Sequence, residues 1–305
     1  MPVSSKSFFH FTSGGFDVFT SILQNGFRIS VSHEAFELER DYIVVGIPMV
    51  CFCDIPISNC EIHASHFCKD KTFVLGLNRE RLRERLEPVR YSSKNIYEYF
   101  QDESSNLLNC VLRNEVSSGS FPTILERLKV TIEKSSYKIP IANKDNTSFS
   151  TSYWSPHLAL TKPERGHYWK YKPDNGTFMI DKEDYIFYNE REWRHVLSPE
   201  TGWVLPYYKK EQCLGTFNNY EIYNEQFHTL KTYCDLHENF MKFNIDDITW
   251  LIVDSEATVL LLINIIRDEK FRKIGGTEIQ SETEKFRLIQ KIVSFDNIKG
   301  DVFSH

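Results

Sequence analysis

The N-terminal segment follows two hydrophobic periods in succession. Residues 6–12 alternate between two faces, which predicts a strand that carries His10 and Thr12 on one face. Two glycines then interrupt the pattern, and apolar residues recur every three or four positions over 16–23, which predicts a helix. Gly26 stands where a helix C-cap belongs. The chain is therefore expected to open as strand, tight turn and helix.

Several later segments have the composition or alternation of strands. The clearest is 44–52, a nearly unbroken apolar run that is typical of a strand buried on both faces. Shorter strands are expected at 72–77, 89–91, 177–180, 185–196 and 248–253. The polar residues 181–184 are expected to form the turn between two of these strands.

Other segments have the spacing of amphipathic helices. Ser58 and Glu61 form a capping-box pattern, and Ser255-Glu256 resembles a second helix start. Helices are expected at 58–68, 78–86, 222–236 and 257–268, and residues 285–293 fit either a strand or a short helix.

The middle of the chain differs from its flanks. Residues 96–112 and 121–132 have helical spacing, and residues 135–160 are polar and predict a loop. No internal repeat, heptad or Pro/Gly linker marks a domain boundary. The sequence therefore predicts one α+β domain over 1–305, with a helical and loop insertion at 96–170.

Composition narrows the class of protein. The chain of 305 residues has a formal net charge of -6, so any nucleic-acid site has to be local rather than a general basic field. We find no apolar run of membrane-spanning length and no secretory pattern near Met1. We therefore expect a cytoplasmic protein without a membrane partner, whose seven cysteines are reduced thiols.

The first candidate for chemistry is the pair His10 and Thr12. Residues two positions apart on a strand share a face, at about 7 Å, and can present donors to a ribose or an amide. The alternative is a half-buried histidine whose hydrogen bonds are satisfied within the strand.

The second candidate is the acidic and basic cluster in the segment Tyr188 to Arg194. On a strand, Glu190, Glu192 and Arg194 point the same way. A carboxylate held by Arg194 could stabilise a developing cation or orient a hydroxyl. Alternatively, these charges pair with one another on an exposed face and contribute little.

The third candidate is a group of cysteines and histidines that could suggest zinc: Cys51, Cys53, Cys60, His63, His66 and Cys68. Their spacing is not that of a standard zinc finger, and we expect no metal and read the cysteines as small apolar residues. Walker, Gly-x-Gly-x-x-Gly, His-Glu-x-x-His and Gly-x-Ser-x-Gly motifs are absent from the sequence.

Four motifs in order resemble the AbiGi-type abortive-infection proteins of bacteria. They are FHFTSGGFDVFTSILQNGFRIS from Phe9, IPMVCFCDIPIS from Ile47, EPVRY from Glu87 and FYNEREWRHV from Phe187. The resemblance runs from about Phe8 to Val196 and is weakest over the insertion. It implies a role in phage defence, either as a toxin or as an antitoxin with a partner from the same operon.

A fainter resemblance links the chain to ADP-ribosyltransferases, whose split mixed and antiparallel β-sheet carries three motifs in order. His10-x-Thr12, the strand at 50–54 and Glu190-x-Glu192 stand in that order. The resemblance implies NAD as substrate. Its implied NAD-binding residues are His10, Phe11, Thr12, Phe52, Cys53 and Tyr91. The middle motif reads Cys-Phe-Cys-Asp where that family has Ser-Thr-Ser, and Tyr91 is the candidate for its tyrosine.

The same resemblance assigns the chemistry to the late strand. Glu192 is expected to stabilise the oxocarbenium as nicotinamide leaves, Glu190 to aim the acceptor, and Arg194 to fix Glu192 or meet phosphate. The leading hypothesis is thus an ADP-ribosyltransferase-like effector that modifies a macromolecular acceptor: DNA, RNA or protein. The second is a non-catalytic antitoxin that neutralises a partner toxin. A third, a zinc-dependent nucleic-acid module, rests on the cysteine and histidine group alone.

Overall fold

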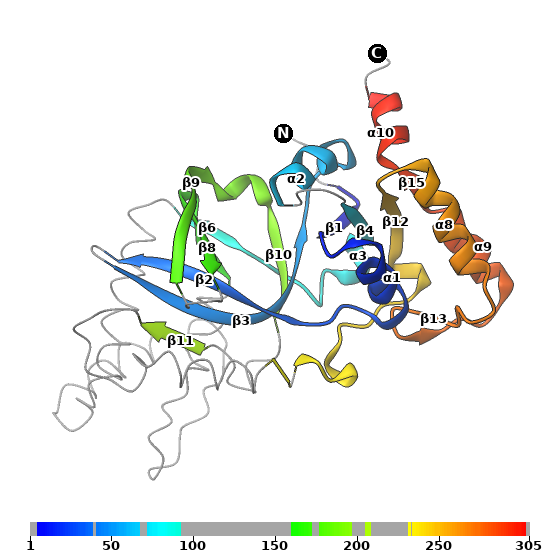
Figure 1. Ribbon diagram of the computed structural model, residues 1–305, viewed down its shortest axis with the longest axis horizontal. Coiled ribbons are helices and arrows are strands. Elements are labelled where there is room, and N and C mark those ends of the chain that lie inside the picture. Colours follow the sequence, from blue (N-terminus) through cyan, green and yellow to red (C-terminus); the bar gives the residue numbers. More distant parts are fainter. Residues whose placement is uncertain are drawn as a thin grey trace, which may run out of the picture.

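The computed structural model describes residues 5–38, 41–67, 72–92, 160–172, 177–196, 205–208, 231–232 and 234–302. Within them the protein is a mixed α+β structure with a large mixed sheet, which confirms the expected class (Figure 1). The helices expected at 96–112 and 121–132, all but the last residue of the loop at 135–160 and most of the helix at 222–236 lie outside the described residues.

The central sheet has nine strands among the described residues, in the order β15-β12-β4-β1-β3-β10-β5, with β2 and β11 also paired to β3. The strands are β1 (Ser7–Thr12), β2 (Ser30–Leu38), β3 (Asp41–Cys53), β4 (Phe73–Asn78), β5 (Glu87–Pro88), β10 (Glu192–Val196), β11 (Leu205–Tyr208), β12 (Ile248–Val253) and β15 (Ile292–Ser294). β12 and β15 run parallel, whereas β1, β3, β4 and β10 pair antiparallel.

Helices cover both faces of the sheet, and each face has its own apolar core. On one face, α1 (Gly15–Asn25), α3 (Arg79–Leu82), α8 (Glu256–Arg267) and α9 (Glu282–Ile289) pack with Phe8 and Phe52. On the other, α2 (Cys60–Phe67) and α10 (Phe295–Val302) pack with Phe9. Side chains alternate along a strand, so neighbouring residues of β1 belong to different cores.

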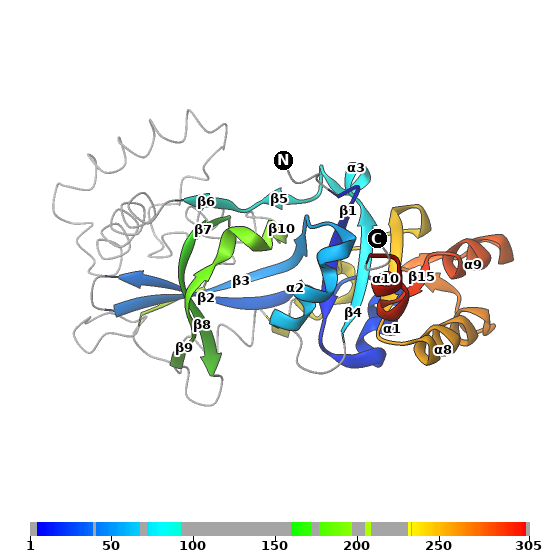
Figure 2. The same cartoon turned by 90° about the horizontal axis from the view of Figure 1, so that it is seen from above.

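The half of the sheet away from these helices is a long ribbon. β2 pairs over its whole length with residues 41–49 of β3, and the two strands curve across the molecule (Figures 1 and 2). In the described part of the chain, three smaller pairs accompany the central sheet. They are β6 (Arg90–Ser92) with β7 (Thr161–Pro163), β8 (Arg165–Lys172) with β9 (Thr177–Ile186), and β13 (Lys273–Ile274) with β14 (Thr277–Glu278).

Two expected helix caps are present, at Ser255 and Gly26, whereas the cap expected at Ser58 is not formed, because Ser58 lies inside η1 (Ile57–Asn59), which has no side-chain cap. The Ser255 hydroxyl accepts the Thr258 N–H at 3.4 Å at the start of α8, and Ser281 caps α9 in the same way. Gly26 ends α1 with φ 95, a conformation that favours glycine, and its N–H donates to the Ile22 carbonyl. The opening strand and helix and the predicted strands at 72–77 and 248–253 are confirmed.

The expected strand over 185–196 is wrong in its first half. Residues 181–184 are not a turn but continue β9, and the strand ends at Ile186. A short 3-10 helix, η4 (Phe187–Glu190), follows before β10 begins at Glu192. Arg191 between them has φ 44, a left-handed conformation that breaks the strand. The polar residues are accommodated by irregular pairing between β8 and β9, with Asp184 at φ 54.

Three other elements differ in extent. The helix expected at 78–86 is only Arg79–Leu82, and the one at 58–68 is divided into η1 (Ile57–Asn59) and α2. The last apolar segment contains both a helix, α9, and a strand, β15. Two further 3-10 turns are η7 (His237–Asn239) and η8 (Ile245–Asp247). No helix in the described part of the chain is both long and apolar enough to cross a membrane.

Candidate functional site

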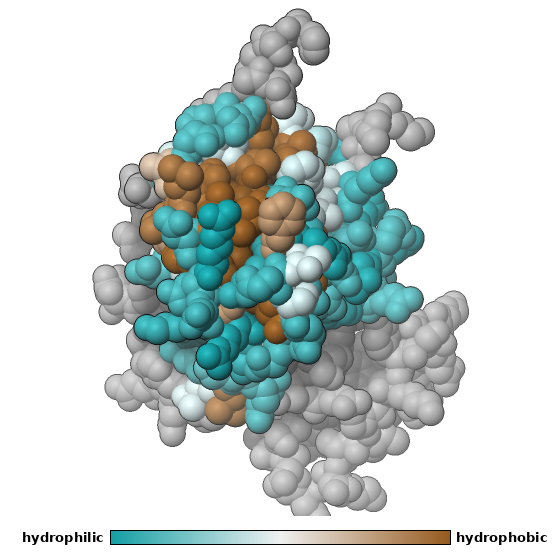
Figure 3. Space-filling model, turned by 90° about the vertical axis from the view of Figure 1, so that its right-hand side faces the viewer, coloured by the Kyte–Doolittle hydropathy of each residue, from teal (hydrophilic) through white to brown (hydrophobic). Residues whose placement is uncertain are grey.

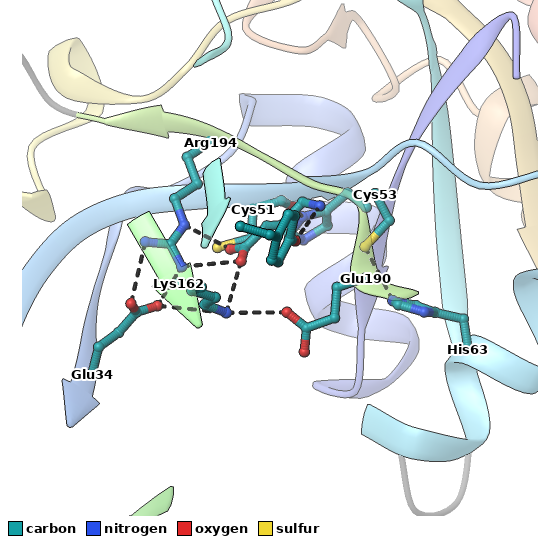
Figure 4. A network of polar contacts seen from close by, with 10 residues as sticks. Glu34, Cys51, Cys53, His63, Lys162, Glu190 and Arg194 are labelled. Atoms are coloured by element: carbon teal, nitrogen blue, oxygen red, sulfur yellow. Dashed lines mark hydrogen bonds and ion pairs between the residues drawn. The ribbon is translucent and has the colours of Figure 1, made fainter. Parts of the chain in front are cut away.

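Five charged residues from four elements meet in a buried network beside β10, and we call them the charge network (Figure 4). They are Glu34 on β2, Lys162 on β7, Glu190 at the end of η4, and Glu192 and Arg194 on β10. The Arg194 side chain is fully buried, and the other four are between 5% and 14% exposed.

Arg194 lies between two carboxylates. Its Nε donates to Glu192 Oε1 at 2.8 Å and its Nη2 to Glu192 Oε2 at 3.0 Å, a bidentate contact. Its Nη1 donates to Glu34 Oε2 at 3.3 Å, and its Nη2 also contacts Glu34 Oε1. Burial opposes the charged form of Arg194, but Glu192 and Glu34 outweigh it and hold its pKa well above the usual value. A guanidinium with no exposure to water is tolerated because both carboxylates pair with it.

Lys162 contacts all three carboxylates of the charge network. Its Nζ lies 2.8 Å from Glu192 Oε2, 3.1 Å from Glu190 Oε2 and 3.8 Å from Glu34 Oε1. Burial would lower its pKa, but Glu190, Glu192 and Glu34 together raise it well above the usual value. Lys162 therefore stays charged and ties η4 and β7 to β10.

Glu190 is the least satisfied member of the network. Its Oε2 meets Lys162, whereas its Oε1 is buried and has no hydrogen-bond partner among the described residues. Burial raises the pKa of Glu190, with Lys162 opposing and Glu192 adding to the rise. For Glu192, burial also acts to raise the pKa, but Arg194 and Lys162 reverse the effect and lower it. The pKa values of the two neighbouring carboxyls are thus shifted in opposite directions.

Tyr91 on β6 binds the backbone of Glu192. Its hydroxyl accepts the Glu192 backbone N–H at 2.9 Å, and its ring lies edge-on to Tyr188. Burial, followed by the charge of Glu192, raises the Tyr91 pKa. Tyr91 therefore acts as a neutral acceptor beside the network.

Backbone pairing places further predicted residues with Glu192. Phe9, Cys53 and Glu192 are partners across β1, β3 and β10, so their side chains share one face. Phe11 shares that face, with its ring 4.8 Å from the His63 ring. Cys53 Sγ lies 3.1 Å from His63 Nε2. Burial raises the Cys53 pKa, with Glu192 and Glu190 adding to the effect, so the group is a thiol rather than a nucleophilic thiolate.

His10 is not part of this arrangement. It follows Phe9 on β1 and points to the opposite face, where its ring packs 4.8 Å from Phe27 and 5.7 Å from Phe52. Its Nδ1 lies 2.9 Å from the Cys51 carbonyl oxygen, and burial lowers its pKa. Thr12 is also buried, and its Oγ1 accepts the Gly14 N–H at 3.4 Å in the strand-to-helix turn. The structure therefore brings Glu190, Glu192, Arg194, Tyr91 and Cys53 together and leaves His10, Thr12 and Phe52 on the other side.

A comparison with known families matches residues 30–254 to the family model described as "Putative abortive phage resistance protein AbiGi, antitoxin". This chain belongs to the AbiGi family. It is also 26% identical over 280 residues to "Abortive phage resistance protein AbiGi" from Lactococcus lactis subsp. cremoris, which covers 90% of this chain and 94% of that protein. No solved structure matches the chain. The AbiGi-type resemblance expected from the motifs is confirmed.

The AbiGi match contains the whole charge network. Glu34, near its start, and Arg194 both fall inside residues 30–254, whereas His10 and α8 lie outside them. The network is thus a feature of the part of the chain that carries the family resemblance.

The cysteines and histidines considered for zinc do not form a metal site among the described residues. Cys60 is buried in the second apolar core, against which Cys53 also packs, and Cys53 contacts His63. The side chains of His66 and Cys68 lie outside the described residues. Among the residues with described side chains, no three or more His, Cys, Asp or Glu groups are arranged to hold a metal.

Two members of the charge network were not predicted from the sequence. Lys162 lies inside the expected insertion at 96–170, and Glu34 lies in a segment to which no element was assigned. The alternating sequence SVSHEAFEL of β2 is the signal that could have indicated a strand there. No local signal joins Glu34 to Arg194, because they are 160 residues apart.

Proposed function

We propose that this protein acts in phage defence as an antitoxin, a non-catalytic protein that binds and neutralises a partner toxin. The observation that carries the proposal is that the carboxylate of Glu192 is fully engaged in ion pairs within the protein. Both of its carboxylate oxygens are bound, by Arg194 and Lys162, and the carboxylate is buried. A carboxylate that stabilises a developing cation has to offer an oxygen to the substrate, and Glu192 offers none in this arrangement.

The position of His10 supports the same proposal. In the transferase hypothesis His10 and Glu192 hold two riboses of one NAD molecule. Here they face opposite sides of the sheet, and the His10 ring packs among apolar side chains instead of facing Glu192. The description of the family model, which names an antitoxin, is a further support. The formal net charge of -6 suits a toxin with a basic surface.

One observation favours the alternative, an NAD-dependent ADP-ribosyltransferase-like toxin that modifies DNA, RNA or protein. Tyr91, Glu190, Glu192 and Arg194 converge, as the resemblance to that superfamily implies. In that hypothesis, Lys162 or Arg194 would have to release Glu192 before NAD could bind. The two proposals therefore differ in whether the charge network opens.

Co-expression with the products of neighbouring genes tests the antitoxin role. One neighbour alone should arrest bacterial growth, and this protein should restore growth and co-purify with that neighbour. A Glu192→Gln variant that retains the wild-type circular dichroism spectrum should neutralise the toxin equally well.

Incubation with labelled NAD, lysate and total nucleic acid tests the alternative directly. We expect no label transfer by the wild type. Growth arrest by this protein alone, together with label transfer that Glu192→Gln abolishes, would overturn the antitoxin proposal in favour of the transferase.

A further inference from the structure

Helix α8 presents an apolar stripe to solvent on the side opposite its core contacts. Leu262 and Ile266 are buried against the sheet, whereas Leu260 is 64% and Leu261 48% exposed. At about 100° per residue, the exposed positions of α8 form one continuous face. Its members are Glu256, Ala257, Leu260, Leu261, Asn264 and Arg267.

The stripe belongs to a larger apolar area. Figure 3 faces the side of the molecule on which α8 and α9 lie, and hydrophobic side chains gather there in one region. α9 packs against α8 and exposes 57% of Phe286. Contiguous apolar surface of this kind is uncommon unless it has a partner.

The charges at the two ends of the stripe indicate which partner fits. Glu256 and Arg267 are both exposed, lie at opposite ends of α8, and fall within about 20° of each other around the helix. Leu260 and Leu261 lie near the midpoint between them. If a second α8 is laid antiparallel on the first, Glu256 of each copy faces Arg267 of the other, and the leucines meet at the centre. The stripe is therefore complementary to itself, as a twofold-symmetric contact requires.

We propose that α8 is a self-association surface through which two copies of this chain form an antiparallel, twofold-symmetric dimer. The leucines at the centre supply the apolar contact, and two equivalent Glu256–Arg267 pairs fix the direction. This inference goes beyond the proposed antitoxin role and does not depend on it, because the charge network and α8 are separate sites.

Sedimentation velocity of the full chain over a range of concentrations tests the dimer. We expect a concentration-dependent dimer for the wild type and a monomer for Leu260→Lys. Ile62→Lys is the matched control: Ile62 on α2 has the same 64% exposure, and its substitution should leave the dimer intact. A monomer at all concentrations for the wild type, or equal loss of the dimer in both variants, would overturn the proposal.

A charge exchange tests the antiparallel direction. Glu256→Arg and Arg267→Glu should each raise the dimer dissociation constant by about tenfold, because each creates two like-charge contacts. The double variant should return to within about threefold of the wild type. Recovery could not come from fold stability, because the double variant places both charges unfavourably for the helix dipole and also loses the bond from the Ser294 hydroxyl to Glu256. Failure of the double variant to recover would show that α8 does not pair in this direction.

Discussion

Arg194 and Glu34 meet although their partners on β3 lie six positions apart. Arg194 pairs with Cys51 and Glu34 with Val45, and six residues of a straight strand span about 20 Å. Side chains of this length could not bridge that separation across a flat sheet. The contact therefore depends on the curvature of β2 and β3 (Figure 1), and it ties Glu34, midway along β2, to Arg194 on β10. The charge network therefore links β2 to β10 across the curved sheet.

Removal of the guanidinium should destabilise the fold strongly. Arg194→Leu leaves Glu34 and Glu192 buried without their main partner, and we expect a loss of about 3–5 kcal/mol in the free energy of unfolding. Urea denaturation followed by circular dichroism measures it. Arg165→Ala is the control, because its ion pair with Asp184 is exposed, at 58% and 69%, and should contribute about 1 kcal/mol or less. Equal losses of unfolding free energy in the two variants would contradict a stabilising role for the buried contacts of Arg194.

The two neighbouring carboxyls should respond differently to the same substitution. Glu190→Gln should change the free energy of unfolding by about 1 kcal/mol or less, because Glu190 Oε1 makes no hydrogen bond and burial favours the neutral form. Glu192→Gln should cost at least about 2 kcal/mol, because it removes the charge that pairs with both Arg194 and Lys162. Urea denaturation midpoints at pH 7 compare the stabilities of the two variants. A larger loss of stability for Glu190→Gln than for Glu192→Gln would contradict this prediction.

The pH dependence of stability should separate the same two residues. A carboxyl whose pKa is raised by folding stabilises the protein below its unfolded pKa and loses that contribution as pH rises. The stability of the wild type relative to Glu190→Gln should therefore fall as pH rises above about 4.5, the ordinary pKa of this side chain. For Glu192, whose pKa is lowered, the contribution is present above the unfolded pKa and is lost as pH falls below about 4.5. Paired urea titrations at each pH measure these differences, and the opposite slope for Glu190→Gln would contradict a Glu190 pKa that folding raises.

The described cysteines should resist alkylation while the protein is folded. Burial raises the pKa of Cys51, Cys53 and Cys60, and it raises the pKa of Cys234 to about 11. At pH 8 all four should remain thiols and react slowly with iodoacetamide. Peptide mass spectrometry before and after denaturation in urea measures the extent at each position. Rapid modification of Cys53 in the folded protein would indicate that the Cys53–His63 pair is activated.

Much of the fold could be predicted because it depends on near neighbours in the chain. The apolar runs of β4 and β12 and the Ser255 cap of α8 were predicted correctly, since periodicity and capping involve residues a few positions apart. The error at 187–191 has a different origin. Phe187 packs towards the interior and Glu190 reaches Lys162, contacts that favour a 3-10 turn over the extended chain that the composition indicated.

The candidate site was predicted only in part for the same reason. The proximity of Glu190, Glu192 and Arg194 follows from their spacing in the sequence, and the structure shows all three buried in one cluster. The sequence could not show that His10 lies on the opposite face of the sheet from these three residues. That arrangement depends on the register of β1 against β3 and of β3 against β10.

By itself the sequence determined the mixed α+β class, the position of the main strands and helices, and the acidic and basic residues of β10. Only the tertiary structure decided that Lys162 and Glu34 complete the network and that His10 faces the other side of the sheet. It also decided that Arg194 and Lys162 bind the carboxylate of Glu192. The physical reason is distance along the chain. Local periodicity reflects contacts within a few residues, whereas the pairing of buried charges 160 residues apart is fixed by strand order, register and curvature.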